Sequence, residues 1–203
     1  MASLKILHVS DIHCCTTILE EILGRVVDAV DAITVSGDFE CDEEVIEVLK
    51  SARKPVFAVT GNMDDHYIAK RLKEEGLSVE AEVVEYRGYL FAGISGREPL
   101  ATMEKVRSEL RSRSSRSIII AHHPPHGLVD VAWSGVHAGL YEARRLVEEL
   151  QPIAYLCGHI HEARGVAKHG RTLVVNPGPV SDGYYAIVVV EDDKATAELH
   201  RAF

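Results

Sequence analysis

Residues 4–13 read LKILHVSDIH, an apolar run that ends in Asp11 and His13. Such a short apolar run indicates a buried β-strand. The segment that follows, residues 17–30, has apolar side chains at helical spacing, namely Ile18, Ile22, Val26 and Val30. A strand followed by a helix is the repeating unit of a sheet that is covered by helices.

The same alternation continues along the chain. We expect further strands at residues 33–35, 56–59, 117–121 and 153–157, and helices at residues 43–52, 67–75, 102–111 and 139–150. Residues 83–86 and 89–92 flank Arg87 and Gly88, a two-residue gap that predicts a tight hairpin. Three late strands, near residues 172–175, 185–190 and 196–200, are separated by Asn-Pro-Gly-Pro and Glu-Asp-Asp turns. The pattern predicts a mixed α/β (α+β) fold and not a wholly parallel sheet.

The whole chain, residues 1–203, is expected to form one domain. Its length is near the upper end of common single-domain sizes. The composition, 46% hydrophobic and 26% charged, is close to the globular average, which excludes a disordered or collagen-like chain. No linker, low-complexity tract or internal repeat divides the sequence.

The formal net charge of −9 argues against a nucleic-acid-binding protein, because such proteins present a basic face that replaces the phosphate counterions. The longest basic stretch, residues 105–116, interleaves Arg with Ser. We interpret it as the solvated end of a helix, where positive charge suits the helix dipole, rather than as a phosphate-binding patch.

We expect a cytoplasmic protein with no membrane partner. The first residues reach a strand without the features of a signal peptide, and no segment approaches the ~20 apolar residues that cross a bilayer. The spacing of the four cysteines, Cys14, Cys15, Cys41 and Cys157, suggests neither a disulfide framework nor a CxxC zinc site. Reduced thiols are therefore the prediction, with Cys14 and Cys15 open to oxidation.

Polar residues stand at the ends of five apolar runs. These residues are Asp11 and His13 after ILHVS, Asp38 after ITVSG, Asn62 after VFAVTG, His122 after SIIIA, and His159 and His161 after IAYLCG. The carboxyl ends of strands in α/β folds converge on one crevice. The sequence therefore predicts that these side chains meet.

Two carboxylates, one amide and four imidazoles form a mixed oxygen and nitrogen ligand set, which suits Mn, Fe, Zn, Co or Ni better than calcium. Seven ligands exceed one tetrahedral site and suit two metals roughly 3.5 to 4 Å apart. Gly37, Gly61 and Gly158 lie beside ligands, where a sharp turn or a close backbone approach needs glycine. Each fragment alone reads equally well as a helix cap or a turn. Their ordered, joint occurrence favours the metal site.

The motifs DIH, GD, GNMD, HHPP and GHIH, in this order over residues 11–161, resemble those of the calcineurin-like metallophosphoesterases. The Asn176-Pro177-Gly178 turn is similar to the tail of the compact bacterial and archaeal branch. The resemblance implies a two-sheet β-sandwich flanked by helices, in four layers. It also implies that the first metal is held by Asp11, His13 and His161, that Asp38 bridges, and that the second metal is held by Asn62, His122 and His159.

The resemblance favours His122 over His123 as the ligand, because the family pattern places one free residue between the ligand and the two prolines. Many family members have a His after the Asn of the third motif, which protonates the leaving group, whereas this chain has Met63. His66 and His137 are the candidates for this catalytic role, and each also reads as a surface residue. Trp133 reads either as a wall for the leaving group or as a packing residue.

The implied function is hydrolysis of a small phosphate ester, a phosphodiester ahead of a monoester, by a hydroxide held between two divalent metal ions. We expect manganese ahead of Fe, Zn, Ni or Co. Asn62 and His122 are expected to contact the substrate as well as the metal. The alternative is a metal-binding protein-interaction scaffold that hydrolyses little. A DNA-repair-type nuclease is a further alternative, against which the acidic charge counts. The late hairpin strands offer an edge for a homodimer.

Overall fold

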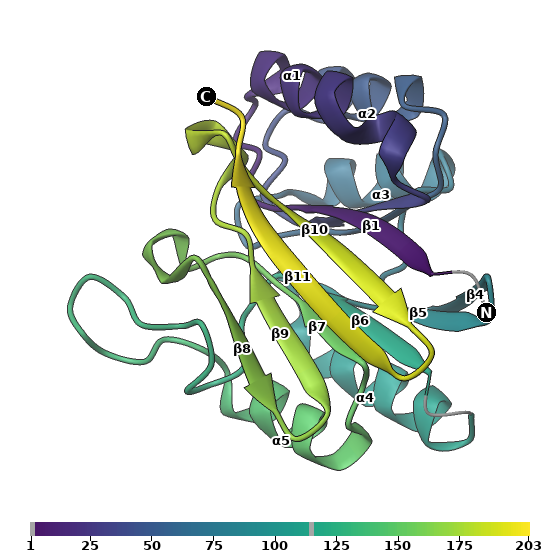
Figure 1. The fold of residues 1–203 in the computed structure, drawn as a ribbon, viewed down its shortest axis with the longest axis vertical. Coiled ribbons are helices and arrows are strands. Elements are labelled where there is room, and N and C mark those ends of the chain that lie inside the picture. The colour runs from purple at the N-terminus through teal and green to yellow at the C-terminus, as the bar shows by residue number, and fades with distance from the viewer. Residues whose placement is uncertain (1–2, 114–115) are drawn as a thin grey trace.

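The chain folds into two β-sheets that pack face to face, with helices on both outer faces (Figure 1). The coordinates are a computed structural model that describes residues 3–113 and 116–203. The first sheet has the order β11-β10-β1-β2-β3. Its strands are β1 (Leu4–Val9), β2 (Ala32–Ser36), β3 (Val56–Val59), β10 (Tyr184–Glu191) and β11 (Lys194–Arg201). The strands β1, β2 and β3 are parallel, and β10 pairs with β1 in the antiparallel sense.

The second sheet has the order β4-β5-β6-β7-β9-β8, with parallel inner strands and an antiparallel strand at each edge. Its strands are β4 (Val83–Tyr86), β5 (Tyr89–Ile94), β6 (Ser117–Ala121), β7 (Ala154–Leu156), β8 (Gly165–His169) and β9 (Thr172–Asn176). Both sheets are thus mixed, as the sequence predicted.

The helices form the two outer layers. They are α1 (Thr16–Val26), α2 (Asp42–Ser51), α3 (His66–Glu74), α4 (Pro99–Arg111) and α5 (Tyr141–Leu150). The first three cover the first sheet, and α4 and α5 cover the second (Figure 1). Three short 3-10 helices, η1 (Val27–Ala29), η2 (His161–Ala163) and η3 (Val180–Asp182), lie between the longer elements.

Alternation along the strands creates three apolar cores. On β1, Leu7 and Val9 face the helices, whereas Leu4 and Ile6 face the second sheet. Neighbouring side chains in a strand point to opposite faces of the sheet, which explains this division. Each sheet therefore has one face against helices and one face against the other sheet. This four-layer arrangement confirms the predicted fold class.

Most predicted elements lie where the sequence placed them, and the differences have local causes. The first helix ends at Val26, and η1 follows, because the chain must turn into β2. Helix α4 begins earlier than predicted, at Pro99, whose fixed φ suits the first helical turn. Leu140 stays extended and bridges Pro125, so that α5 begins only at Tyr141.

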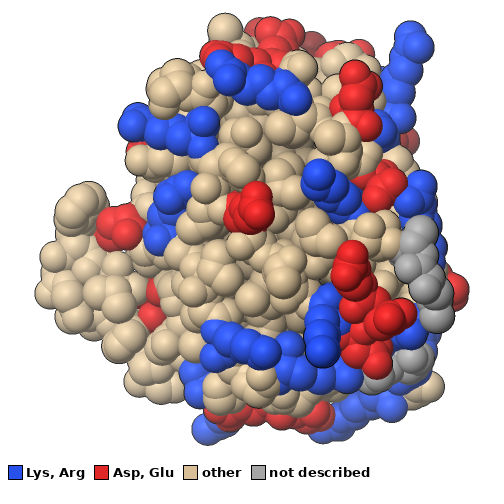
Figure 2. Space-filling model, in the orientation of Figure 1, with Lys and Arg blue, Asp and Glu red and all other residues tan. Residues whose placement is uncertain are grey.

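The exposed charges are mixed in sign. On the face drawn in Figure 2, basic side chains alternate with acidic ones. In α4, Arg107 and Arg111 both form ion pairs with Glu149, which supports the interpretation of the basic stretch as a solvated helix face. The last part of that stretch, residues 114–115, lies outside the described residues. No helix in the described ranges is long and apolar enough to cross a membrane.

His8 is a buried polar residue that the sequence reading did not single out. It lies on β1 between the sheets, fully buried, with its ring nitrogens 3.0 Å from the Thr34 hydroxyl and 3.0 Å from the Cys157 carbonyl. Burial lowers the pKa of His8 to about 4. His8 is therefore neutral in the folded protein and links the two sheets near the ends of their strands.

The free energy of unfolding is expected to fall as the pH decreases from about 6.5 to about 4. In this range the unfolded chain takes up a proton at His8, whereas the folded chain does not. The stability that comes from neutral, buried His8 is therefore fully present above the ordinary pKa of histidine and is lost as the pH falls below it. The loss is about 3 kcal/mol for a shift of this size. Urea unfolding of metal-free protein at pH 7, 5.5 and 4.5 measures it, and His8→Gln should flatten the dependence. An unchanged slope in this variant would contradict the assignment.

Candidate metal centre

The loop after β1 brings Asp11 and His13 to the seam between the sheets. It runs beside the loop after β2, with the amide of Asp11 donating to Gly37 O (3.0 Å) and that of His13 to Asp38 O (2.9 Å). Asp11, His13 and Asp38 all have positive φ, near 50°, a region that L-residues visit rarely. Such local strain is typical of functional sites, where the surrounding structure holds it in place.

Glycines allow the loops to approach one another closely. A Cβ on Gly61 would overlap the Asp38 carboxylate, and a Cβ on Gly158 would overlap Ser10 and Asp11. Gly37 has a φ of 94° and also lies against Gly61. The sequence reading of these three glycines as sites of sharp turns or close approach is confirmed.

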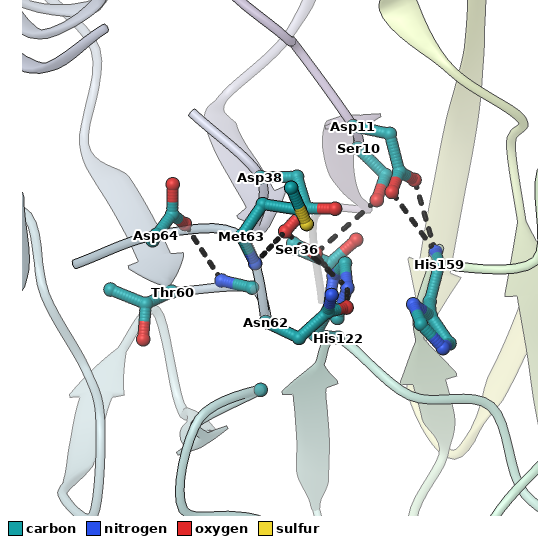
Figure 3. A network of polar contacts seen from close by, with 12 residues as sticks. Ser10, Asp11, Ser36, Asp38, Thr60, Asn62, Met63, Asp64, His122 and His159 are labelled. Carbon is teal, nitrogen blue, oxygen red and sulfur yellow. Dashed lines mark hydrogen bonds and ion pairs between the residues drawn. The ribbon is translucent and has the colours of Figure 1, made fainter. Parts of the chain in front are cut away.

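Asp64 joins the loop after β2 to the loop after β3. One carboxylate oxygen accepts from the amides of Phe39 (2.7 Å) and Glu40 (3.0 Å), and the other accepts from the amide of Gly61 (2.7 Å). The amide of Met63 donates to Asp38 Oδ1 at 3.0 Å (Figure 3). Asp64 therefore positions the loops that carry Asp38 and Asn62.

His122 follows β6 and is fully buried beneath these loops. Its Nδ1 lies 2.7 Å from the Ser36 carbonyl, which fixes Nδ1 as the protonated nitrogen, because a carbonyl only accepts. Its Nε2 is the ring nitrogen that faces the other candidate ligands, 2.8 Å from Asn62 Oδ1 and 3.6 Å from Asp38 Oδ1. Figure 3 shows Asn62 and His122 together, facing the acidic side chains.

The segment after β7 carries His159 and His161. The His159 amide donates to both oxygens of Asp11, at 3.2 and 3.0 Å, and the His159 ring packs near those of His122 and His123. The side-chain amide of Asn176 donates to Ile160 O at 2.8 Å, and its Oδ1 accepts from the Gly178 amide at 3.0 Å. The Asn-Pro-Gly turn thus holds the segment that presents both imidazoles.

Two overlapping groups of side chains could hold metal ions. In one group the ligand atoms of Asp11, His13 and His161 lie within 4.8 Å of one another, and in the other those of Asp11, Asp38 and His122 do so. Asp11 belongs to both groups, whereas the family resemblance gives the bridging role to Asp38. Asn62 lies beside the second group through its contact with His122.

The chemistry of these donors fits metal ions. His13 Nε2 and His161 Nε2 lie 3.3 Å apart, and His161 Nε2 is also 3.3 Å from Asp11 Oδ1. Two imidazole nitrogens that face each other and a buried carboxylate form an arrangement that a cation stabilises. On its other side, His13 Nδ1 lies 3.4 Å from Glu40 Oε2, the kind of support that orients a metal-binding imidazole.

The protonation states suit the same role. Burial alone would raise the pKa of the Asp11 carboxyl, but the hydrogen bond from His161 and the charge of His122 lower it overall. Burial, reinforced by the neighbouring His122 and His123, lowers the pKa of His159 to about 3. The hydrogen bond to Asp11 raises the pKa of His161. An ionised carboxylate and a neutral His159 are the forms that bind metal.

The two candidates for the leaving-group acid lie in different places. His66 is the first residue of α3, exposed, and lines a small hollow with Thr60, Glu80 and Arg97. His137 lies on the long loop after β6, with Nδ1 2.7 Å from the buried carboxylate of Asp130. The sequence reading did not identify Asp130.

The prediction of four reduced cysteines is wrong for two of them. Cys14 and Cys41 form a disulfide, which joins the residue after His13 to the residue after Glu40. Cys15 and Cys157 are free. The pairing was not visible in the sequence, because residues 14 and 41 are far apart along the chain and only the pairing of the two loops brings them together.

Comparison with known proteins identifies the family. The calcineurin-like phosphoesterase superfamily domain matches residues 4–193, and the chain belongs to this family. The uncharacterized protein MJ1162 of Methanocaldococcus jannaschii is 28% identical over 94% of this chain and 96% of its own length.

Solved structures share the fold. TT1561 of Thermus thermophilus superimposes with a TM-score of 0.79 at 19% identity, over the full length of both chains. An archaeal protein described as a novel phosphodiesterase superimposes with a TM-score of 0.62 at 16% identity, over 97% of this chain and all of its own.

Loss of the Cys14–Cys41 disulfide is expected to destabilise the protein. The bond closes a loop with a sequence separation of 27, so that its removal by Cys41→Ser should lower the free energy of unfolding by about 3 kcal/mol. Urea unfolding under non-reducing conditions measures this loss. Cys15→Ser is the matched control, since Cys15 is free, and it should behave like the wild type. Equal stability of the Cys41→Ser protein would show that the bond does not constrain the unfolded chain.

Proposed function

We propose that the protein is a phosphoesterase that uses two divalent metal ions to hydrolyse a small phosphate ester, a phosphodiester in preference to a monoester. The observation that carries this proposal is the pair of ligand groups that share the buried carboxylate of Asp11. We assign the first metal to Asp11, His13 and His161, the second to Asn62, His122 and His159, and Asp38 to both. When bound, two such ions supply Lewis-acid stabilisation of the phosphoryl oxygens and an activated water molecule.

The charge of the ligand set supports an anionic substrate. Asp11 and Asp38 are its only carboxylates, and the amide and the imidazoles carry no charge when they bind a metal ion. Two divalent ions carry four positive charges, so that the loaded site stays cationic although the chain has a net charge of −9. The amide Asn62 preserves this balance, because a third carboxylate would cancel part of the attraction for phosphate. Asn62 and His122, whose polar atoms face each other, are our candidates for contact with the phosphoryl group.

We assign protonation of the leaving group to His137 rather than to His66. The carboxylate of Asp130 accepts from His137 Nδ1, so that Nε2 is the nitrogen left to exchange a proton. His137 lines a surface hollow of about 270 Å³ together with Ala163 and Arg164, which follow His161 along the chain. An orienting carboxylate behind an imidazole is the arrangement that general acid–base catalysis uses.

The preference for diesters rests on the archaeal protein of the same fold that is described as a phosphodiesterase. Met63, which follows Asn62, offers no proton for a leaving group, so that another residue must supply it. We further propose Mn²⁺ as the first metal to test, ahead of Fe, Zn, Ni and Co, since the mixed oxygen and nitrogen donors accept each of these.

We also propose a cytoplasmic location and a single domain over residues 1–203. A cytoplasmic location would expose the Cys14–Cys41 disulfide to cellular reductants. A single domain agrees with cores that are shared between both sheets and all five α-helices. The acidic chain does not favour nucleic acid as a partner. β11 lies at the edge of the first sheet, where a second copy could pair with it.

Hydrolysis is expected to depend on added metal and on Asp38. Metal-stripped protein should hydrolyse bis-p-nitrophenyl phosphate only after Mn²⁺ or a related ion is restored. Asp38→Ala should lower kcat/KM at least about 100-fold, because loss of a ligand exceeds the 10- to 100-fold cost of losing a group that merely supports one. Asp28→Ala, at an exposed site in η1, is the matched control. Stoichiometric metal binding without turnover of diester or monoester would instead favour the scaffold.

The role of His137 is tested by varying the leaving group. His137→Asn should lower kcat about 100-fold or more for a diester with an alkyl leaving group, which needs a proton. The effect should be much smaller for p-nitrophenolate, which leaves without one. Asp130→Asn should shift the same ratio in the same direction, and His66→Asn should leave it unchanged. An equal loss for both leaving groups in His137→Asn would mean that His137 is structural.

A further inference from the structure

The loop between β6 and α5 contains a segment, residues 127–139, that we call the tip loop. It reads GLVDVAWSGVHAG, and Asp130, its one residue of the types Asp, Glu, Lys and Arg, is buried. The loop extends from the body of the molecule in Figure 1, and the matching protrusion in Figure 2 is mostly uncharged. In a chain of which 26% is charged, this surface is exceptional.

The tip loop is a built structure with its own hydrogen bonds. Val131 bridges His137, the Ala132 amide donates to Val136 O at 2.9 Å, and the Gly135 amide donates to Ala132 O at 2.8 Å. Asp130 closes the base, because its carboxylate accepts from the amides of Gly127 (2.9 Å) and Gly139 (3.0 Å) as well as from His137. These contacts form a short hairpin with Trp133 in its turn.

Trp133 is held at its backbone and free at its side chain. Its amide donates to Glu162 Oε1 at 2.6 Å, and Glu162 is the residue after His161. The residue is 89% exposed, and no aromatic or cation contact to the indole occurs within residues 3–113 and 116–203. An exposed indole on a hairpin that is tied to a metal-binding segment contributes little to the core, so it has room to contact something else.

We propose that Trp133 is a stacking platform for a planar aromatic or heteroaromatic group on the substrate, which makes it a specificity-determining residue. This proposal rests on the proposed phosphodiesterase function and names the class of ester. The phosphate would bind at the ligand cluster beside His161, and an attached ring would lie on the indole face. Ring systems of any kind stack on Trp, since stacking needs only a π-face.

The size and charge of the tip favour a ring over a larger partner. The exposed apolar residues of the hairpin, Val131, Trp133 and Val136, present one indole flanked by two small side chains. A stable protein interface needs about 800 Å² on each partner, much more than such a tip offers. The net charge of −9 opposes attachment to an acidic membrane surface.

Fluorescence tests the proposal directly, because Trp133 is the one tryptophan in the chain. With Mn²⁺ present, phenylphosphonate should change the emission in a saturable way, whereas methylphosphonate and inorganic phosphate, which bind without a ring, should change it little. The proposal is overturned if the emission responds equally to phenylphosphonate and methylphosphonate.

Inhibition of bis-p-nitrophenyl phosphate hydrolysis gives the second measurement. The ratio of the inhibition constants of methylphosphonate and phenylphosphonate should fall about tenfold in Trp133→Ala and stay within about threefold of wild type in Trp133→Phe, which keeps a ring. Val136→Ala, on the same hairpin, is the control and should retain the wild-type ratio. An unchanged ratio in Trp133→Ala overturns the proposal, since a merely structural role would affect both inhibitors alike.

The two proposals fail in different ways. Without any turnover, a ring-dependent change of emission would still support the stacking platform and would refute only the hydrolytic function. Turnover that depends on metal, with no preference for phenylphosphonate in either measurement, would refute the platform and leave the phosphoesterase intact.

Discussion

The buried carboxylate of Asp11 is the constraint on which the rest of the site depends. A buried charge is costly unless hydrogen bonds and opposite charge compensate it. Here the His159 amide donates to both oxygens, and His161 and His122 lower the carboxyl pKa despite burial. Compensation requires the segment after β7 to lie directly against the loop after β1, and Gly158 permits that approach. One ionised group thus dictates the meeting of two loops from different sheets.

Because the loops that meet at the site belong to both sheets, the site depends on the packing of the whole sandwich. The loops of the first sheet supply Asp11, His13, Asp38 and Asn62, and those of the second supply His122, His159 and His161. Ligands for either proposed ion therefore come from both sheets. Binding energy of the ions would act across the seam and hold the sheets together. His8 joins the same two layers without a metal, through Thr34 and the Cys157 carbonyl.

Strand periodicity and the strand-end residues could be read from the sequence because both depend on local pattern. The hairpin at Arg87 and Gly88 followed from chemistry as well: both residues have positive φ, and a two-residue turn needs such residues. β8 was missed although Gly170 and Arg171 also form a two-residue turn, with positive φ at Gly170, because the residues of β8 alternate weakly in polarity. The meeting of the strand-end side chains could be predicted as well, since parallel strands share one end, whereas their role as metal ligands stays a prediction.

The features that the sequence does not predict depend on contacts between loops that are far apart along the chain. The disulfide requires knowledge that the loops after β1 and β2 pair residue by residue, which the sequence does not encode locally. Asp130 looks like an ordinary loop residue until the chain closes and its carboxylate accepts from Gly127, His137 and Gly139. Asp64 likewise joins two loops, because its carboxylate accepts from the amides of Phe39 and Gly61. In each case a polar side chain satisfies backbone amides that only tertiary structure brings together.

The ligand cluster and the tip loop differ in how firmly the fold holds them. The proposed metal ligands follow strand ends, where the sheets fix them and small shifts would break several contacts at once. The tip loop, in contrast, joins the body through a base closed by Asp130 and through the contact of Trp133 with Glu162. The turn of its hairpin, residues 132–136, can change in sequence without disturbing a strand or a proposed ligand. Proteins of this fold with the same strand-end residues could therefore differ in what they bind by changes in this turn alone, so that the fold by itself does not determine the ligand.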